Sequence, residues 1–172
     1  ELTTSKISEE VLVYKDSWGI PHIEAQNKHD AIFAYGYTVA KDRLFQMDLQ
    51  RRLSQGKLSE LLGDDLVEID IMFRTYLFKN WAENYLSSSH LSEESLSYVN
   101  AFVEGVNHFV ETGEKPFEYY LLNANVESFS AVDVASMTAY MAFTFMDGIR
   151  FDGLYTMLKE KVGEKNMVIL FP

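Results

Sequence analysis

The side chains most often used in catalysis or metal binding are few and scattered in this chain of 172 residues. No two of its four histidines have the spacing of metal ligands, and we interpret each as a surface or half-buried residue: His22, His29, His90 and His108. There are no cysteines, which excludes a disulfide framework, a thiolate metal site and a cysteine nucleophile. The sequence also lacks a glycine-rich phosphate loop, an HExxH motif, an EF-hand loop and a GxSxG elbow. We therefore expect no self-contained catalytic constellation.

Two pairs of adjacent acidic residues come nearest to a general acid and base: Asp64–Asp65 and Glu93–Glu94. The first pair lies in a predicted loop, and the second lies at the start of a predicted helix. Acidic side chains in the first turn of a helix interact favourably with the helix dipole. We therefore interpret both pairs as solvated charges rather than as catalytic groups.

The composition excludes several classes of protein. The 15 Lys and Arg residues against 26 Asp and Glu residues give a net charge of −11, which argues against nucleic-acid binding. Hydrophobic residues make up 47% of the chain, which is enough for a core and excludes a disordered protein. No window approaches the roughly 20 apolar residues that a bilayer requires, so no membrane span is expected. Because no repeat or linker is found, residues 1–172 are predicted to form a single unit.

The elements that must position any site begin with a predicted β-hairpin. A β-branched and aromatic run at 11–14 and a second extended segment at 20–25 flank a turn that contains Gly19. Pro21 cannot donate a hydrogen bond to a neighbouring strand, which places it at a sheet edge or a strand start.

From Asn27 onward the apolar residues recur with the period of an α-helix. Asparagine and serine at N-cap positions and glycine at C-terminal positions indicate the boundaries. We predict a first helix that is capped by Asn27 or Asp30 and ends near Gly56 or Gly63, followed by helices at 67–86, 92–113 and 130–145. Two short helical pieces follow after Asp152 and are separated at Gly163. The predicted fold class is therefore mainly α with an N-terminal β-hairpin.

The residues at the two ends of the chain support predictions about processing and about a partner. The chain begins at Glu1 rather than at methionine, and it finishes on the apolar residues Leu170, Phe171 and Pro172. We expect the first residue to be a processed end and the apolar last residues to pack on another polypeptide. An isolated two-stranded hairpin is marginal in water, which favours the same expectation.

A long series of short motifs between residues 11 and 75 resembles the opening of the penicillin acylase family. It consists of VYKDSWGIPHIEA at 13–25, AKDRLFQMD at 40–48 and GKLSELLG at 56–63, followed by Asp70 and Arg74. Single pieces of this pattern are weak evidence, whereas the whole series in this order is specific. Further along, residues 152–163 are similar to a late stretch of the family's small subunit.

The resemblance implies that the chain is the small (α) subunit of an N-terminal nucleophile hydrolase, a penicillin amidase-type enzyme that acts on linear amides. In that family a precursor cuts itself into α and β subunits, which together complete an αββα fold. The nucleophile is a serine at the first position of the β subunit, and its own α-amine acts as the base. The resemblance therefore implies no catalytic residue in this chain and no organic cofactor. The implied partners are the β subunit and a small-molecule N-acyl substrate.

The resemblance also implies a substrate-binding wall near the end of the predicted fourth helix. Its residues are Phe145, Met146, Arg150 and Phe151, with Gly148 as the hinge of a mobile gate. Methionine and phenylalanine side chains suit an aromatic or alkyl acyl group, and Arg150 suits a carboxylate on the leaving group. The alternative is that Met146 and Phe151 continue a hydrophobic face into the core.

A structural calcium ion that bridges the subunits is a further implication, with Asp152 as the ligand from this chain. Asp147 is the neighbouring acid that could replace it, and a helix N-cap role for Asp152 is the alternative. The family's usual export, together with the missing initiator methionine, predicts a periplasmic or secreted protein.

Several residues of the first predicted helix could either bind substrate or support the fold. Four charged residues are substrate-ligand candidates, although structural ion pairs are favoured: Asp42, Arg43, Arg51 and Arg52. The aromatic run Phe33, Tyr35 and Tyr37 is favoured as core rather than pocket.

The substrate also stays open at this point. The opening motifs do not distinguish a penicillin G acylase-like enzyme from an acyl-homoserine lactone or cephalosporin acylase. A non-catalytic helical binding module is the hypothesis from another class of protein.

Overall fold

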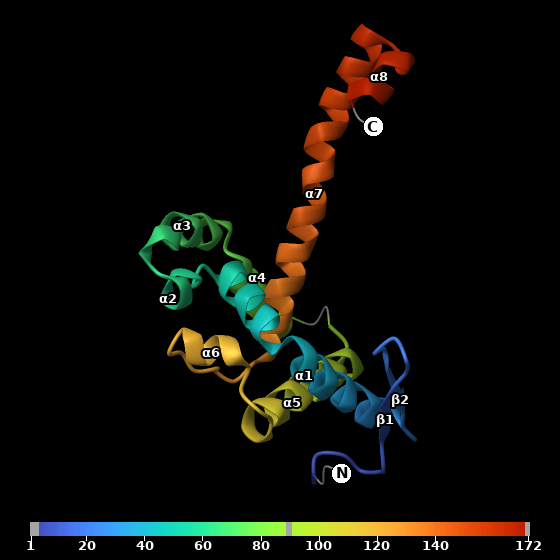
Figure 1. The fold of residues 1–172 in the computed structure, drawn as a ribbon, viewed down its shortest axis with the longest axis vertical. Coiled ribbons are helices and arrows are strands. Elements are labelled where there is room, and N and C mark those ends of the chain that lie inside the picture. Colours follow the sequence, from blue (N-terminus) through green and yellow to red (C-terminus); the bar gives the residue numbers. More distant parts are fainter. Residues whose placement is uncertain (1–3, 89–90, 171–172) are drawn as a thin grey trace.

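The computed structural model describes residues 4–88 and 91–170, apart from the side chains of residues 147–150, 168 and 170. It is mainly helical with a small antiparallel sheet near the N-terminus, as predicted (Figure 1). Its elements are β1 (Leu12–Lys15), β2 (Pro21–Glu24), α1 (Lys28–Gln55), α2 (Ser59–Leu62), the 3₁₀ helix η1 (Asp64–Leu66), α3 (Val67–Tyr76), α4 (Phe78–Ser87), α5 (Glu93–Thr112), α6 (Phe117–Leu121), α7 (Ala131–Val162) and α8 (Glu164–Leu170).

The N-terminal hairpin lies where the sequence predicts it. Tyr14 on β1 pairs with His22 on β2, and their rings stack with centroids 5.1 Å apart. The Asp16 carboxylate closes the turn by accepting two backbone N–H hydrogen bonds of 2.9 Å. Gly19 adopts the positive φ of 77° that this turn requires, which glycine does without steric cost.

Helix α1 begins and ends at the predicted caps. The Asn27 side chain accepts a hydrogen bond from the Asp30 N–H at 2.8 Å, and Gly56 ends the helix in the left-handed region. Between them Arg43, with φ −142° and ψ 18°, departs from helical geometry and kinks the helix. No glycine or proline marks this kink, so sequence analysis does not predict it.

Helices α1 and α5 cross where two glycines face the opposite backbone. A Cβ atom on Gly36 would overlap the carbonyl oxygen of Phe102, and one on Gly105 would overlap the carbonyl oxygen of Phe33. The two helix backbones therefore approach so closely that only glycine fits at either position.

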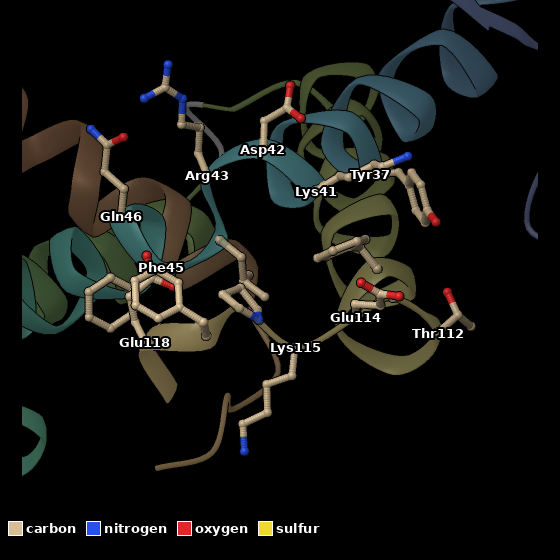
Figure 2. Close-up of a pocket in the computed structure, with 15 residues that line it drawn as sticks. Tyr37, Lys41, Asp42, Arg43, Phe45, Gln46, Thr112, Glu114, Lys115 and Glu118 are labelled. Atoms are coloured by element: carbon tan, nitrogen blue, oxygen red, sulfur yellow. The ribbon is translucent and has the colours of Figure 1, made fainter. Parts of the chain in front are cut away.

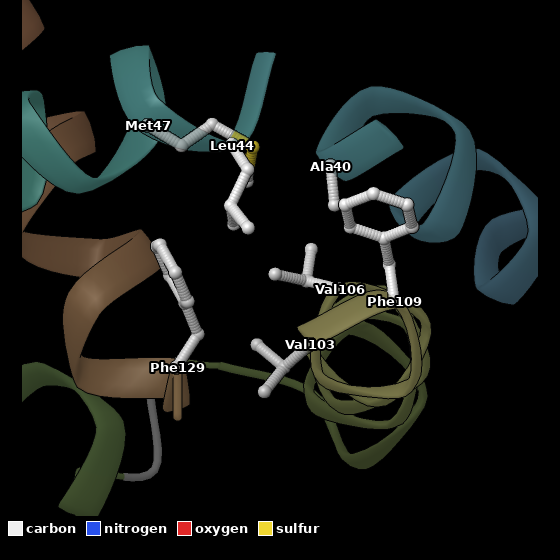
Figure 3. Close-up of a cluster of buried hydrophobic side chains, with 7 residues drawn as sticks. All are labelled: Ala40, Leu44, Met47, Val103, Val106, Phe109 and Phe129. Carbon is white, nitrogen blue, oxygen red and sulfur yellow. The ribbon is translucent and has the colours of Figure 1, made fainter. Parts of the chain in front are cut away.

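The main core lies beside this crossing (Figure 3). It joins α1, α5 and the segment that precedes α7 through seven buried side chains: Ala40, Leu44, Met47, Val103, Val106, Phe109 and Phe129. Asn107 holds the last of these segments in place. Its amide donates to the carbonyl oxygen of Phe129 at 2.9 Å and accepts from the Phe129 N–H at 2.7 Å.

The predicted helix over residues 67–86 is wrong in one respect, because it is two helices. Leu77 has φ 59° and ψ 30°, which ends α3 and starts α4. This left-handed conformation costs a non-glycine residue about 1–2 kcal/mol, so local preference does not favour it. Rings on both sides of Leu77 pack against α7, and this tertiary packing outweighs the local cost.

Helix α7 is longer than predicted. It runs without interruption from Ala131 to Val162, so the predicted end near residue 145 and the separate helical piece after Asp152 are wrong. The predicted break at Gly163 is confirmed, and α8 follows it. Figure 1 shows the second half of α7 standing clear of the body, with α8 at its far end. Among the described residues, no helix is long and apolar enough to cross a membrane.

Candidate functional site

Helix α7 carries the residues predicted to bind the acyl group. Its start is fixed by a capping box, in which the Asp133 N–H donates to the Ser130 hydroxyl oxygen at 3.4 Å and the Ser130 N–H donates to the Asp133 carboxylate at 2.6 Å. Gln55 at the end of α1 donates to the Asp133 carboxylate as well, at 2.6 Å. The first turns of α7 are therefore anchored to α1, which makes the body of the protein a rigid base for the candidate site.

The predicted acyl-binding side chains lie where α7 has left the body. Phe145, Met146 and Phe151 are 78%, 58% and 64% exposed, so none of them continues the core of this chain. An α-helix turns by about 100° per residue, which places Met146 and Phe151 about 140° apart around the axis. In the uninterrupted helix these two side chains therefore do not share one face.

The predicted hinge and the guanidinium lie in a part of α7 whose side chains are not described. Residues 147–150, which include Gly148 and Arg150, continue the helix, and their side chains lie outside the described residues. A single glycine inside a helix costs only about 1 kcal/mol relative to alanine, so its presence does not force a break. The role of Arg150 as a carboxylate ligand stays a prediction.

The predicted calcium ligand, Asp152, is exposed and lies inside α7 rather than at a helix start. The alternative N-cap role is therefore wrong. Calcium requires six to eight oxygen ligands. Within the part of the chain that the structure describes, no group of three or more Asp, Glu, His or Cys side chains is placed to hold a metal ion.

The paired arginines of α1 form a structural network. Arg51 and Arg52 are 5% and 7% exposed, and both donate to the buried carboxylate of Asp48. Arg51 also donates to the backbone carbonyl oxygens of residues 127 and 128 at 3.2 and 3.1 Å, just before α7. The Tyr119 hydroxyl donates to Asp48 at 3.0 Å, and burial together with this negative charge raises the pKa of the phenol. The predicted structural role of the two arginines is confirmed.

The remaining two charged candidates on α1 differ from each other. The Asp42 carboxylate accepts a hydrogen bond from Lys15 of the hairpin at 2.7 Å, so it acts as a structural ion pair, as predicted. Arg43 is exposed at the kink, and among the described residues it has no hydrogen-bond or ion-pair partner. The structure does not assign a ligand to it.

A hollow of about 1020 Å³ lies at the kink, between α1, the end of α5 and the start of α6 (Figure 2). Its wall combines the aromatic side chains of Tyr37 and Phe45 with acidic and basic groups such as Glu114 and Lys115. Its described lining contains no histidine, serine or cysteine. The aromatic run therefore divides: Phe33 is buried as predicted, Tyr35 is 54% exposed, and Tyr37 lines this hollow.

Comparisons with known proteins identify the family. The family model described as penicillin amidase matches residues 10–172, which is nearly the whole chain. The chain belongs to the penicillin amidase family. The resemblance seen in residues 11–75 is thus confirmed and extends through the α7 stretch that carries the candidate site.

Relatives within the penicillin amidase family include enzymes of two named activities. The chain is 39% identical over 127 residues to penicillin acylase 2 proenzyme from Pseudomonas sp. strain SE83, covering 73% of this chain and 16% of the relative. It is 30% identical over 174 residues to penicillin G acylase from Escherichia coli, covering 95% of this chain and 20% of the relative. An acyl-homoserine lactone acylase from Pseudomonas aeruginosa is 29% identical over 168 residues, covering 96% of this chain and 20% of the relative. The chain thus spans about a fifth of the length of these proteins or less.

A solved structure in the family has the same fold. A chain of thermostable penicillin G acylase from Alcaligenes faecalis is 27% identical, with a TM-score of 0.73. The match covers 96% of this chain and 90% of that chain. The overall arrangement of the helices and the N-terminal hairpin is therefore one that this family has in a solved structure.

Sequence analysis missed several residues that support the body from which α7 projects. The histidine interpretation agrees with the structure for His22, His29 and His108, whereas His90 lies outside the described residues. The Nε2 atom of His108 is buried without a hydrogen-bond partner among the described residues. The neighbouring sequence does not indicate this burial. The aromatic cluster around Leu77 was also missed, although the density of rings in YLFKNWAENY was a usable signal.

Proposed function

We propose that this chain is the small (α) subunit of a heterodimeric amidohydrolase that cleaves the side-chain amide of penicillins or of related N-acyl compounds. The family match over residues 10–172 is the observation that carries the proposal. The solved penicillin G acylase chain supports the subunit role, because its extent is close to that of this chain. In this proposal the partner is a β subunit from the same precursor, released by autoproteolysis, and the two complete an αββα fold.

The proposed reaction uses a nucleophile that this chain does not contain. A serine hydroxyl at the first position of the β subunit attacks the amide carbonyl carbon, and its terminal amine accepts the hydroxyl proton through water. Fixed donors of the β subunit stabilise the oxyanion, the amine leaves with a proton, and water hydrolyses the acyl-enzyme. The contribution of this chain is to shape the acyl-binding pocket.

Helix α7 is the part of this chain that we assign to the pocket. Phe145, Met146 and Phe151 expose apolar surface that suits a phenyl or alkyl acyl group. Because the intact helix spreads these side chains around its axis, opening of α7 at Gly148 would allow Met146 and Phe151 to face one ligand. Arg150 is assigned to a carboxylate on the leaving group.

The test uses the assembled, fully processed protein. It is incubated with penicillin G, a phenylacetyl anilide and a long-chain N-acyl-homoserine lactone, and release of the amine product is measured. A matched control is this chain co-expressed with a separate β subunit that begins with alanine in place of serine, so that assembly does not depend on self-processing. Turnover that this control abolishes supports the proposal. No turnover of any amide would favour a non-catalytic helical binding module instead.

A second candidate within the same chemistry is an N-acyl-homoserine lactone acylase. The observation that favours it is the identity of 29% over 96% of this chain to the acyl-homoserine lactone acylase from Pseudomonas aeruginosa. The ratio of kcat/KM for the long-chain lactone to kcat/KM for penicillin G distinguishes the two. A ratio well above one would favour the lactone acylase.

We further propose that the protein is periplasmic or secreted and that a calcium ion bridges Asp152 and oxygen ligands of the β subunit. The resemblance to exported family members supports the first, and the exposed carboxylate of Asp152 supports the second. Fractionation of producing cells tests the location.

Metal analysis of the complex, purified without chelator, is expected to find calcium that the Asp152→Asn variant loses. Complex that contains no calcium would contradict the assignment.

A further inference from the structure

Five aromatic rings join the α3–α4 corner to α7, and we call this cluster the aromatic clamp: Phe73, Tyr76 and Phe78 from the corner, with Tyr140 and Phe143 from α7. The rings of Tyr76 and Phe143 are the closest pair, with centroids 4.7 Å apart. Phe73 contacts Tyr140 at 5.6 Å, and Phe78 contacts Phe143 at 5.6 Å. Both α7 rings are therefore held by rings of the corner.

The backbone of the corner is strained, and the strain brings these rings together. Leu77 lies between Tyr76 and Phe78 and has a positive φ of 59°, which side chains with a Cβ disfavour. Its own side chain is 56% exposed, so its contacts within this chain do not compensate for the strain. In one straight helix, Tyr76 and Phe78 would point about 160° apart. The turn at Leu77 instead places both rings against Phe143.

The aromatic clamp lies where α7 leaves the body. Phe143 is partly buried against the corner, whereas Phe145, two residues further, is 78% exposed. Figure 1 shows α7 standing clear of the other helices beyond this level, until α8 at its far end. The direction of the outer half of α7 relative to the body is therefore set at the clamp.

We propose that the aromatic clamp positions the acyl-binding residues of α7 and thereby determines the acyl preference of the enzyme, with Tyr76 as a positioning residue. This inference rests on the proposed function, because it concerns the same site. Tyr76 acts through Phe143 and the helix, and it does not touch the substrate.

The geometry amplifies small changes at the clamp. In the intact α7 of this structure, before any opening at Gly148, Phe151 lies eight residues beyond Phe143, which is about 12 Å along the helix. A tilt of about 5° at the clamp therefore moves the backbone of Phe151 by about 1 Å. A gap of that size removes a large part of the van der Waals contact between a side chain and a bound acyl group. Loss of one clamp ring is thus sufficient to weaken the binding of an acyl group to the wall.

The test compares three variants in the assembled protein. Tyr76→Leu removes the ring, Tyr76→Phe keeps it, and Trp81→Leu removes a ring of α4 that stacks on Tyr85 at 5.0 Å rather than on α7. For Tyr76→Leu we expect KM for the phenylacetyl anilide to rise about tenfold while kcat per active site stays within about twofold. The nucleophile is not on α7, so only acyl binding changes. Tyr76→Phe and Trp81→Leu are expected to keep the wild-type KM.

A double variant tests whether Tyr76 acts through the acyl-binding wall. If it does, the effects of Tyr76→Leu and Phe151→Ala on KM are less than multiplicative in the double variant, because the Phe151 ring is part of what Tyr76 positions. Fully multiplicative effects on KM would overturn the proposal. If Tyr76→Leu does not assemble, Phe143→Leu removes the opposing ring and is measured in the same way.

The outcomes separate this inference from the proposed function. If the wild type turns over an amide and Tyr76→Leu keeps the wild-type KM and acyl preference, the role of the clamp is overturned. The proposed function is unaffected by that result. An equal change in KM in Trp81→Leu overturns it as well, because Trp81 stacks on Tyr85 within α4 and is not one of the clamp rings. No turnover of any amide by the wild type overturns the proposed function, and the clamp with it.

Discussion

Asp30 is almost fully buried, with 1% of its surface exposed, and it receives hydrogen bonds from three residues. The backbone N–H groups of Ser8 and Glu9 donate to it at 3.1 and 3.0 Å, and the Asn27 amide donates at 2.7 Å. Burial by itself raises the pKa of the carboxyl, but these hydrogen bonds outweigh it and lower the pKa to about 2. A charged Asp30 therefore ties the segment before the hairpin to the start of α1.

Asp30→Asn is expected to lower the free energy of unfolding by about 1–3 kcal/mol at pH 7, because buried donors lose a charged acceptor. The pKa in the folded state lies below that of an unfolded aspartate, so this contribution is present above about pH 4. It is lost as the pH falls toward the folded pKa of about 2. Denaturant unfolding of the assembled protein over this pH range measures the difference from wild type. The exposed Asp64→Asn is the control, and a difference independent of pH would contradict the assignment.

Phe151→Ala is expected to raise KM for a phenylacetyl substrate by roughly tenfold or more and to change the acyl preference. This is the size expected for loss of roughly 1–3 kcal/mol of pocket contact. Self-processing and the overall fold are expected to survive, because the side chain is 64% exposed in this chain. Steady-state kinetics with two acyl lengths measure the change. A variant that misfolds, or one that keeps the wild-type preference, would refute the assignment of Phe151 to the pocket.

At the scale of elements, the crossing of α1 and α5 organises the body. Gly36 and Gly105 let the two backbones touch, and the core of α1 and α5 side chains lies directly beside them. The Asp48 network and Asn107 then connect this pair of helices to the segment that starts α7. The placement of α7 therefore depends on a contact between two helices that are far apart in the sequence.

Gly105→Ala is expected to destabilise the protein by about 1–3 kcal/mol, although alanine is the better helix former by about 1 kcal/mol. The reason is that its Cβ would overlap the carbonyl oxygen of Phe33, so the helices must separate. Thermal unfolding of the assembled protein measures the effect. The neighbouring exposed residue provides a matched control, since Glu104→Ala should stay within about 0.5 kcal/mol of wild type. A gain in stability for Gly105→Ala would mean that the crossing is looser than described.

The elements also show which features a sequence can predict. The hairpin, both ends of α1 and α5 and the start of α7 were predictable, because caps such as Asn27, Ser92 and Ser130 act within a few residues. The turn at Leu77 was not predictable, because rings of α7 stabilise a left-handed conformation that leucine disfavours. The continuation of α7 through Gly148 was not predicted either, since one glycine is compatible with both a hinge and an intact helix. For the site, sequence and resemblance could name candidate residues, but their arrangement around α7 required the structure.

At the scale of the whole molecule, the body is well packed and the outer half of α7 is not. The side chains from Phe145 outward expose large apolar groups that include Phe151, Leu154 and Met157. Exposed apolar surface of this kind marks an interaction site or an aggregation hazard. This exposed surface of α7 is consistent with the proposed role of the chain as a subunit that packs on another polypeptide and binds an acyl group.

The chain expressed alone is expected to aggregate or to bind a hydrophobic dye, because no described residue of the body covers the outer half of α7. Light scattering and dye fluorescence, compared with the assembled protein, provide the measurement. Replacing Phe145 and Met157 together by serine is expected to reduce both signals. A lone chain that stays monodisperse, binds no dye and melts cooperatively would contradict this prediction.

The close crossing of α1 and α5 at Gly36 and Gly105 also has a consequence during synthesis. The two residues are separated by about 70 positions, and ribosomes add roughly 5–20 residues per second, so α1 waits about 4–14 s for its partner helix. During that interval Phe33, Leu44 and Met47, which are buried in the finished fold, have no complementary surface. The nascent chain therefore passes through a window in which a chaperone at the exit tunnel has an exposed helix to protect.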